Sequence, residues 1–102
     1  MANPFQSKLI KVTCSGTGSA AGQPFVFVNR SNGDKQRGVL SSTKSAIIDC
    51  ANFTNGWSDS QILELIVSGP AYGTTTITLA GPAIQTSSLA LTEQTAPVTT
   101  NV

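Results

Sequence analysis

The sequence predicts an all-β fold, an antiparallel sandwich of about seven short strands, and three observations support this prediction. Apolar and polar residues alternate over short runs, as in residues 7–14, where Val12 and Cys14 share one face. A strong strand signal runs into the pair Asn32-Gly33, and an Asn-Gly pair is typical of a tight hairpin turn. Strand-like runs then recur at roughly ten-residue spacing, as they do in β-sandwiches.

Each strand is assigned from its own apolar pattern. We expect strands at residues 7–14, 25–29, 35–41, 44–50, 61–68, 74–80 and 84–91. The run Phe25-Val26-Phe27-Val28 has apolar side chains on both of its faces, so something beyond the opposite sheet is expected to cover its outer face. Residues 61–68 form the most apolar stretch and predict a central strand that is covered on both faces.

A compact aromatic corner joins the fourth strand to the fifth, over residues 51–57. Asp49 is placed to accept a backbone N–H and to cap a single helical turn there. Phe53 and Trp57 are at helical spacing, so we expect them to plug the end of the sandwich. Calcium binding by Asp49 and Asp59 is the alternative, but two carboxylates make a poor calcium shell, and capping is favoured.

Composition limits the classes of function. The chain has 102 residues, enough for one domain, and only 11% of them are charged, against about 25% in typical proteins. Its net charge of +1 gives no basic surface for nucleic acid, and no apolar run approaches the length of a membrane span. The first eight residues lack the features of a signal peptide. A weakly charged surface without an export signal predicts a virion component made in the host cytoplasm, or a fragment of a larger surface protein.

Residues suited to catalysis are scarce. The chain has no His, and its five acidic residues show no convergent pairing, so we expect no enzyme, no metal site and no cofactor. Cys14 and Cys50 are predicted to be two buried thiols that pack as small apolar side chains. A disulfide between the first and fourth strands is the alternative, which a reducing compartment disfavours.

Both ends of the chain lack a core pattern. Residues 1–6 are assigned to an N-terminal arm and residues 92–102 to a C-terminal arm, which leaves residues 7–91 as the sandwich. We expect neighbouring subunits to order both arms, because neither arm has the apolar pattern to fold alone. Aromatic and apolar residues in the arms and in a Pro/Gly turn are the candidate interface residues. They are Pro4, Phe5, Tyr72, Pro97 and Val98.

Two segments resemble a known family. Phe25–Asp34 resembles the V-x-V-x-N-R-T-T-G-E hairpin of small immunoglobulin-like, carboxypeptidase-regulatory-like β-sandwich modules. Ile48–Trp57 is similar to their x-D-L-A-N-F-x-x-G-Y corner, with Cys50 where these modules usually have Leu. The resemblance covers about residues 23–80 and implies an immunoglobulin-like sandwich of the kind found in microbial surface proteins and in virion proteins of phages and archaeal viruses. It implies no catalytic residue.

The function expected from these observations is structural. We expect a non-enzymatic virion protein, most simply a capsid-associated or decoration subunit, that docks on the shell and ties its neighbours through its arms. Its partners would be other virion subunits or further copies of itself, with no nucleic acid and no membrane. The alternatives are an adhesion or carbohydrate-binding module of a microbial surface protein, and a tail or fibre subunit.

Overall fold

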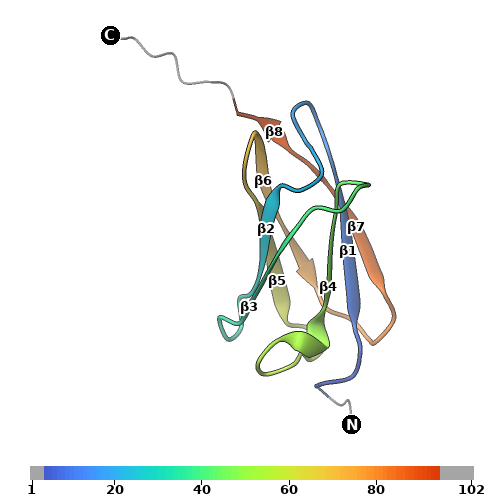
Figure 1. Ribbon diagram of the computed structural model, residues 1–102. Coiled ribbons are helices and arrows are strands. Elements are labelled where there is room, and N and C mark those ends of the chain that lie inside the picture. The colour runs from blue at the N-terminus through green and yellow to red at the C-terminus, as the bar shows by residue number, and fades with distance from the viewer. Residues whose placement is uncertain (1–3, 95–102) are drawn as a thin grey trace.

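Two β-sheets pack face to face in the computed structural model, which describes residues 4–94 (Figure 1). The strands are β1 (Leu9–Ser15), β2 (Pro24–Asn29), β3 (Lys35–Val39), β4 (Ser45–Asp49), β5 (Ile62–Val67), β6 (Ala71–Thr78), β7 (Gln85–Ala90) and β8 (Thr92–Glu93). A short 3-10 helix, η1 (Cys50–Asn52), follows β4. One sheet has the order β4-β1-β7 and the other β3-β2-β5-β6-β8, so the predicted all-β sandwich is confirmed.

One strand pair departs from the antiparallel pattern that the sequence predicts. β7 runs parallel to β1, with Gln85 opposite Ile10 and Ala90 opposite Ser15, whereas the other paired strands are antiparallel. The reason is the connection after β6, which crosses from the five-stranded to the three-stranded sheet instead of forming a hairpin (Figure 1). The prediction of a wholly antiparallel sandwich is therefore wrong at this pair.

The core lies between the two inner faces and follows from the alternation within each strand. In β1 the residues Ile10, Val12 and Cys14 point inward and are at most 3% exposed. In β2 the inward rings of Phe25 and Phe27 meet edge to face, with centroids 5.6 Å apart. β5 contributes Leu63, Leu65 and Val67, each at most 1% exposed.

The β2–β3 hairpin forms where the Asn-Gly pair predicts it. Asn29 pairs with Asp34 across the hairpin, its N–H donating to the Asp34 carbonyl at 2.7 Å, which leaves residues 30–33 as the loop. Gly33 has a φ of +83°, a left-handed conformation that glycine adopts without a steric penalty. The loop is thus longer than a two-residue turn.

The aromatic corner forms as predicted. Asp49 is the N-cap of η1, and its Oδ1 accepts the Ala51 N–H at 3.0 Å. Phe53 and Trp57 are 2% and 3% exposed and close this end of the core. Both the predicted cap and the predicted aromatic plug are confirmed.

The N-terminal segment differs from the expected arm. The Pro4 carbonyl accepts the Trp57 backbone N–H at 2.9 Å, and the Gln6 carbonyl accepts the indole Nε1–H of Trp57 at 2.7 Å. Gly56 contacts Pro4 so closely that a Cβ there would overlap the Pro4 carbonyl. Residues 4–6 therefore lie against the corner of their own domain, because the corner offers donors for their backbone carbonyls.

The C-terminal segment also begins inside the sandwich. Thr92 and Glu93, which the sequence assigns to the arm, form β8 and pair with Tyr72 and Ala71 at the edge of the five-stranded sheet. This two-residue pairing is too short to leave a sequence pattern. Residues 95–102, with Pro97 and Val98, lie outside the described residues.

Candidate protein interface

The outer face of the five-stranded sheet carries a group of exposed apolar side chains. The exposed residues on this face are Val39 (62%), Tyr72 (48%), Ile62 (41%) and Ile66 (38%). Val26 and Val28 lie on the same face of β2, between β3 and β5, and are only partly buried. Antiparallel sheets that face water usually carry polar residues on that side, so this face is unusual for a surface that stays in water.

Strand register places these residues in rows across the sheet. Val26 lies opposite Arg37 of β3 on one side and opposite Ile66 of β5 on the other. In the adjacent row, Val28 lies between Lys35 of β3 and Glu64 of β5. The centre of the face is therefore apolar, with cations along β3 and a carboxylate on β5.

Towards β6 the same face becomes polar. Thr74 lies opposite Ile66, Thr76 opposite Glu64 and Thr78 opposite Ile62. The Thr74 hydroxyl donates to Glu64 Oε2 at 3.1 Å. This row of threonines forms a polar border to the apolar centre.

Two sequence predictions bear on this face. The apolar pattern on both sides of β2 predicts a cover over its outer face, and no described residue supplies one, since Val26 and Val28 are shielded only in part. β5 is central, between β2 and β6, as predicted. Its outer face is open in residues 4–94, with Ile62 and Ile66 exposed, so the prediction of cover on both faces is not met there.

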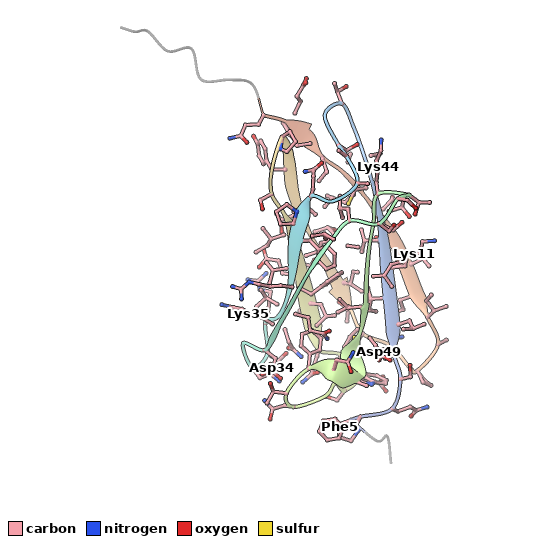
Figure 2. The ribbon with its side chains drawn as sticks, in the orientation of Figure 1. Phe5, Lys11, Asp34, Lys35, Lys44 and Asp49 are labelled. Atoms are coloured by element: carbon pink, nitrogen blue, oxygen red, sulfur yellow. The ribbon has the colours of Figure 1, made fainter. Side chains whose placement is uncertain are left out.

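Among the predicted interface residues that the structure describes, Tyr72 lies apart from Pro4 and Phe5. Tyr72 lies at the start of β6, at the β8 end of the sheet and on its outer face. Phe5 is 57% exposed at the opposite end, below η1 (Figure 2). Pro4 belongs to the corner, and Pro97 and Val98 are outside the described residues. Of the three candidates within residues 4–94, Tyr72 alone is part of the outer face described above.

The sequence contains a signal for the apolar residues of the outer face, which were not among the predicted interface residues. The run Phe25-Val26-Phe27-Val28 is apolar at every position, and the run Ile62–Val67 is apolar at every position except Glu64. Consecutive positions in a strand point to opposite faces. Exposed side chains on one face follow from this pattern once the inner face is known. What the pattern could not supply was the pairing that makes Val26 a neighbour of Ile66.

Lys8 is a buried cation whose burial the sequence pattern did not predict. Its side chain is 0% exposed, and its Nζ donates to the carbonyls of Ala80 (3.2 Å) and Ala83 and lies 5.8 Å from the Trp57 ring centroid. Burial lowers the pKa of Lys8, and the nearby Cys50 and Asp59 oppose this shift. Lys8 thus ties the start of β1 to the β6–β7 connection, which is a structural role.

The acidic residues at the corner bind the protein's own backbone. Asp49 accepts the N–H groups of Lys8 (2.9 Å) and Ala51 (3.0 Å) and the Ser7 hydroxyl (2.7 Å). Burial acts to raise the pKa of Asp49, but these hydrogen bonds outweigh it and hold the pKa below its ordinary value. Asp59 accepts the Gly81 N–H at 2.7 Å. Asp49 therefore caps η1 as predicted, whereas Asp59 caps no helix and instead holds the backbone of the β6–β7 connection.

Cys14 and Cys50 are buried free thiols, as the sequence predicts. They lie at opposite ends of the β1–β4 pair, because Thr13 pairs with Ser45 and Leu9 with Asp49. About six residues of strand, roughly 20 Å, separate them, far more than a disulfide spans. Burial, reinforced by Asp49 and opposed by Lys8, raises the pKa of Cys50 to about 12. Burial also raises the pKa of Cys14.

Residues 4–94 include no cluster of three side chains suited to metal binding and no cavity. Within that range, no helix is long and apolar enough to cross a membrane.

Comparison with known proteins bears on the fold. Neither a protein-family model nor a curated protein matches the sequence. Among solved structures, the Bacillus anthracis TIE protein has a similar fold over 86% of this chain, with a TM-score of 0.59 and 12% sequence identity. The match spans 17% of that protein's chain. At this identity the likeness supports the β-sandwich architecture alone.

Proposed function

We propose that this protein is a non-enzymatic structural subunit of a virus particle, a capsid-associated or decoration protein, which docks on protein partners through the outer face of the five-stranded sheet. The observation that carries the proposal is the apolar centre of that face, where Val26 and Ile66 lie side by side between a cationic edge and a polar border.

Burial of this apolar centre would stabilise docking. An exposed aliphatic side chain stabilises an association when it leaves water, by roughly 25 cal/mol for each Å² of apolar surface. Contiguous apolar patches on soluble proteins commonly mark contact sites. With 11% charged residues the chain has little long-range steering, which suits a lasting assembly more than a fast transient encounter.

The assignment to a virion rests on two further observations. The segments 25–34 and 48–57 resemble modules found in virion proteins and in microbial surface proteins, and the chain forms both the hairpin and the capped corner that those segments predict. Asp49, Trp57 and Lys8 fix the corner to the ends of both sheets, so the sandwich presents its faces as rigid surfaces.

Purified particles test this proposal. Particles are banded by density from cultures that produce the protein, and the gradient fractions are analysed by peptide mass spectrometry. We expect peptides of this chain in the band that contains packaged genome, at a fixed ratio to the shell protein. A protein confined to the cell envelope would instead be an adhesion module, and the proposal would be wrong.

A pair of matched variants tests the surface. Ile66→Ser alters the outer face of the five-stranded sheet, and Ile47→Ser alters an exposed Ile on β4 of the other sheet. Purified protein is added back to particles stripped of it. We expect Ile66→Ser to weaken rebinding about tenfold or more and Ile47→Ser to rebind like the wild type. Equal effects would mean that the five-stranded face is not the docking surface.

A further inference from the structure

We infer that a second copy of this chain covers the outer face of the five-stranded sheet, in a dimer whose two-fold axis runs along β2. This inference rests on the proposed function in one respect, since it names a neighbouring copy of the chain as the protein partner that this surface meets on the particle. Rebinding to particles then depends on this face through contacts between neighbouring copies. It is argued from the positions of charged residues that strand register fixes on either side of β2.

The charged residues of this face are asymmetric about β2. Lys35 on β3 and Glu64 on β5 lie in one row, with Val28 of β2 between them. Arg37 lies in the next row on the same side as Lys35. The β3 side of β2 is therefore cationic, and the β5 side carries a carboxylate. Each of these neighbouring strands lies about 5 Å from β2, which is one strand spacing.

A two-fold axis along β2 exchanges these flanks. When two such faces meet, β3 of one copy lies over β5 of the other, so Lys35 faces the partner's Glu64 and Glu64 faces the partner's Lys35. Val26 and Val28 then lie on the axis and pack against their own copies. The row that is asymmetric in one chain becomes self-complementary in the dimer, as an isologous interface requires.

The alternative axis gives the opposite result. A two-fold axis across the strands would place β3 over the partner's β3, so that Lys35 and Arg37 would approach the same two cations of the second copy. Like charges brought together across an interface oppose association. Charge complementarity therefore selects the axis along β2.

The groups needed for these contacts are available. Lys35 forms no ion pair with another described residue, and it lies on the opposite side of the sandwich from Lys11 (Figure 2). Glu64 accepts one hydrogen bond, from Thr74 to Oε2, which leaves Oε1 for a cation. Lys35 and Glu64 are two strands apart, about 10 Å, and Val28 separates them within the chain.

The size of the face sets the expected strength. Three strands of about six residues present a surface of roughly 15 by 20 Å. This is well below the roughly 800 Å² per partner of a standard interface, so we expect a weak dimer with a dissociation constant of roughly 100 μM. Aligned packing of two sheets about 10 Å apart accommodates such a contact.

Charge-reversal variants test the dimer. Sedimentation equilibrium measures the dissociation constant of each variant, made as the full chain. We expect the wild type to dimerise at roughly 100 μM, and Lys35→Glu and Glu64→Lys each to weaken dimerisation about tenfold or more. The double variant K35E/E64K should dimerise like the wild type. An equimolar mixture of the two single variants should form heterodimers, because both cross-pairs are then of opposite charge.

Lys11→Glu is the matched control, a charge reversal on the outer face of β1 that should leave dimerisation unchanged. Circular dichroism melts of every variant confirm that each one folds. A wild type that stays monomeric up to about 1 mM would overturn the inference, as would single variants that dimerise normally. A double variant that stays monomeric would also overturn it.

The outcomes separate this inference from the proposed function. A monomeric protein that still bands with particles would refute the dimer and leave the virion role intact. If the charge-reversal variants behave as expected but the protein is absent from particles, the dimer would be established and the virion role refuted.

Discussion

The two sheets of this sandwich share one core but differ in the faces that they turn to water. On the three-stranded sheet, Leu9 lies opposite Asp49 and Ile47 lies opposite Lys11, so each exposed apolar residue has a charged neighbour. On the five-stranded sheet, Val26 lies directly opposite Ile66. Both faces contain exposed aliphatic residues, and only strand register decides whether these form a continuous apolar surface.

The difference extends to the edges. β7, at one edge of the three-stranded sheet, turns small residues outward, among them Thr86, Ser88 and Ala90. β3, at one edge of the five-stranded sheet, turns Lys35, Arg37 and Val39 outward. The first face offers little apolar area for a partner, whereas the second combines an apolar centre with charges placed to orient one. This contrast teaches that pairing, more than composition, makes a binding face.

Substitutions on the two faces of β5 should give the largest difference in the free energy of unfolding. Leu65 points into the core at 0% exposure, and its neighbour Ile66 points outward at 38%. Leu65→Ala should lower the free energy of unfolding by about 2–5 kcal/mol through the cavity it leaves, and Ile66→Ala by less than about 1 kcal/mol. Denaturant melts measure both. Similar losses would mean that the outer face is covered within the chain itself.

Substitution of Asp49, the charged residue opposite Leu9, tests what this carboxylate contributes to the stability of the three-stranded sheet. Asp49→Ala removes the acceptor for the Lys8 and Ala51 N–H groups and should cost about 1–2 kcal/mol near neutral pH. The folded-state pKa of Asp49 lies below its ordinary 3.8, so its carboxylate stabilises the fold above that pH and loses this contribution as pH falls through the folded value. The gap between wild type and variant should therefore close in acid.

Asp49→Asn is the matched control for this effect, because it keeps an acceptor oxygen and removes the titration. Its stability should lie between those of wild type and Asp49→Ala at neutral pH. A wild-type advantage over Asp49→Asn that persists unchanged at pH 2 would contradict the assigned role of the charge.

Two truncations test the edge of the five-stranded sheet. Deleting residues 92–102 removes β8 and its pairing with Ala71 and Tyr72, and should lower the melting temperature by about 4–8 °C for each kcal/mol lost. Deleting residues 95–102 leaves β8 in place, and we expect almost no change. Calorimetry compares the two. An equal loss from the shorter deletion would assign residues 95–102 to the fold.

Lys11→Val gives the smallest expected change in stability and the sharpest test of the comparison. It places an apolar residue opposite Ile47 and so copies the Val26–Ile66 arrangement onto the three-stranded sheet. The melting temperature should change little, since surface substitutions usually lie within about 0.5 kcal/mol. Light scattering should show increased self-association. An unchanged monomer would mean that adjacency of two exposed aliphatic residues is not enough to form a contact.

The local features of this protein were predictable from its sequence. Alternation predicted which residues of β1 and β2 share a face, Asn32-Gly33 predicted the hairpin, and Asp49 predicted the capped turn. Each of these depends on residues within a few positions of one another, where strand geometry and capping follow directly from residue type.

The neighbours of each strand, in contrast, depend on long-range pairing in the folded chain. Alternation assigns a residue to a face and leaves open which strand lies beside it. The parallel pairing of β7 with β1 and the contact of Val26 with Ile66 therefore had no local signal. The burial of Lys8 likewise depends on carbonyls more than seventy residues away, at Ala80 and Ala83. Long-range pairing fixes the outer face on which the proposed contacts rest, since register places the charges of β3 and β5 on either side of β2.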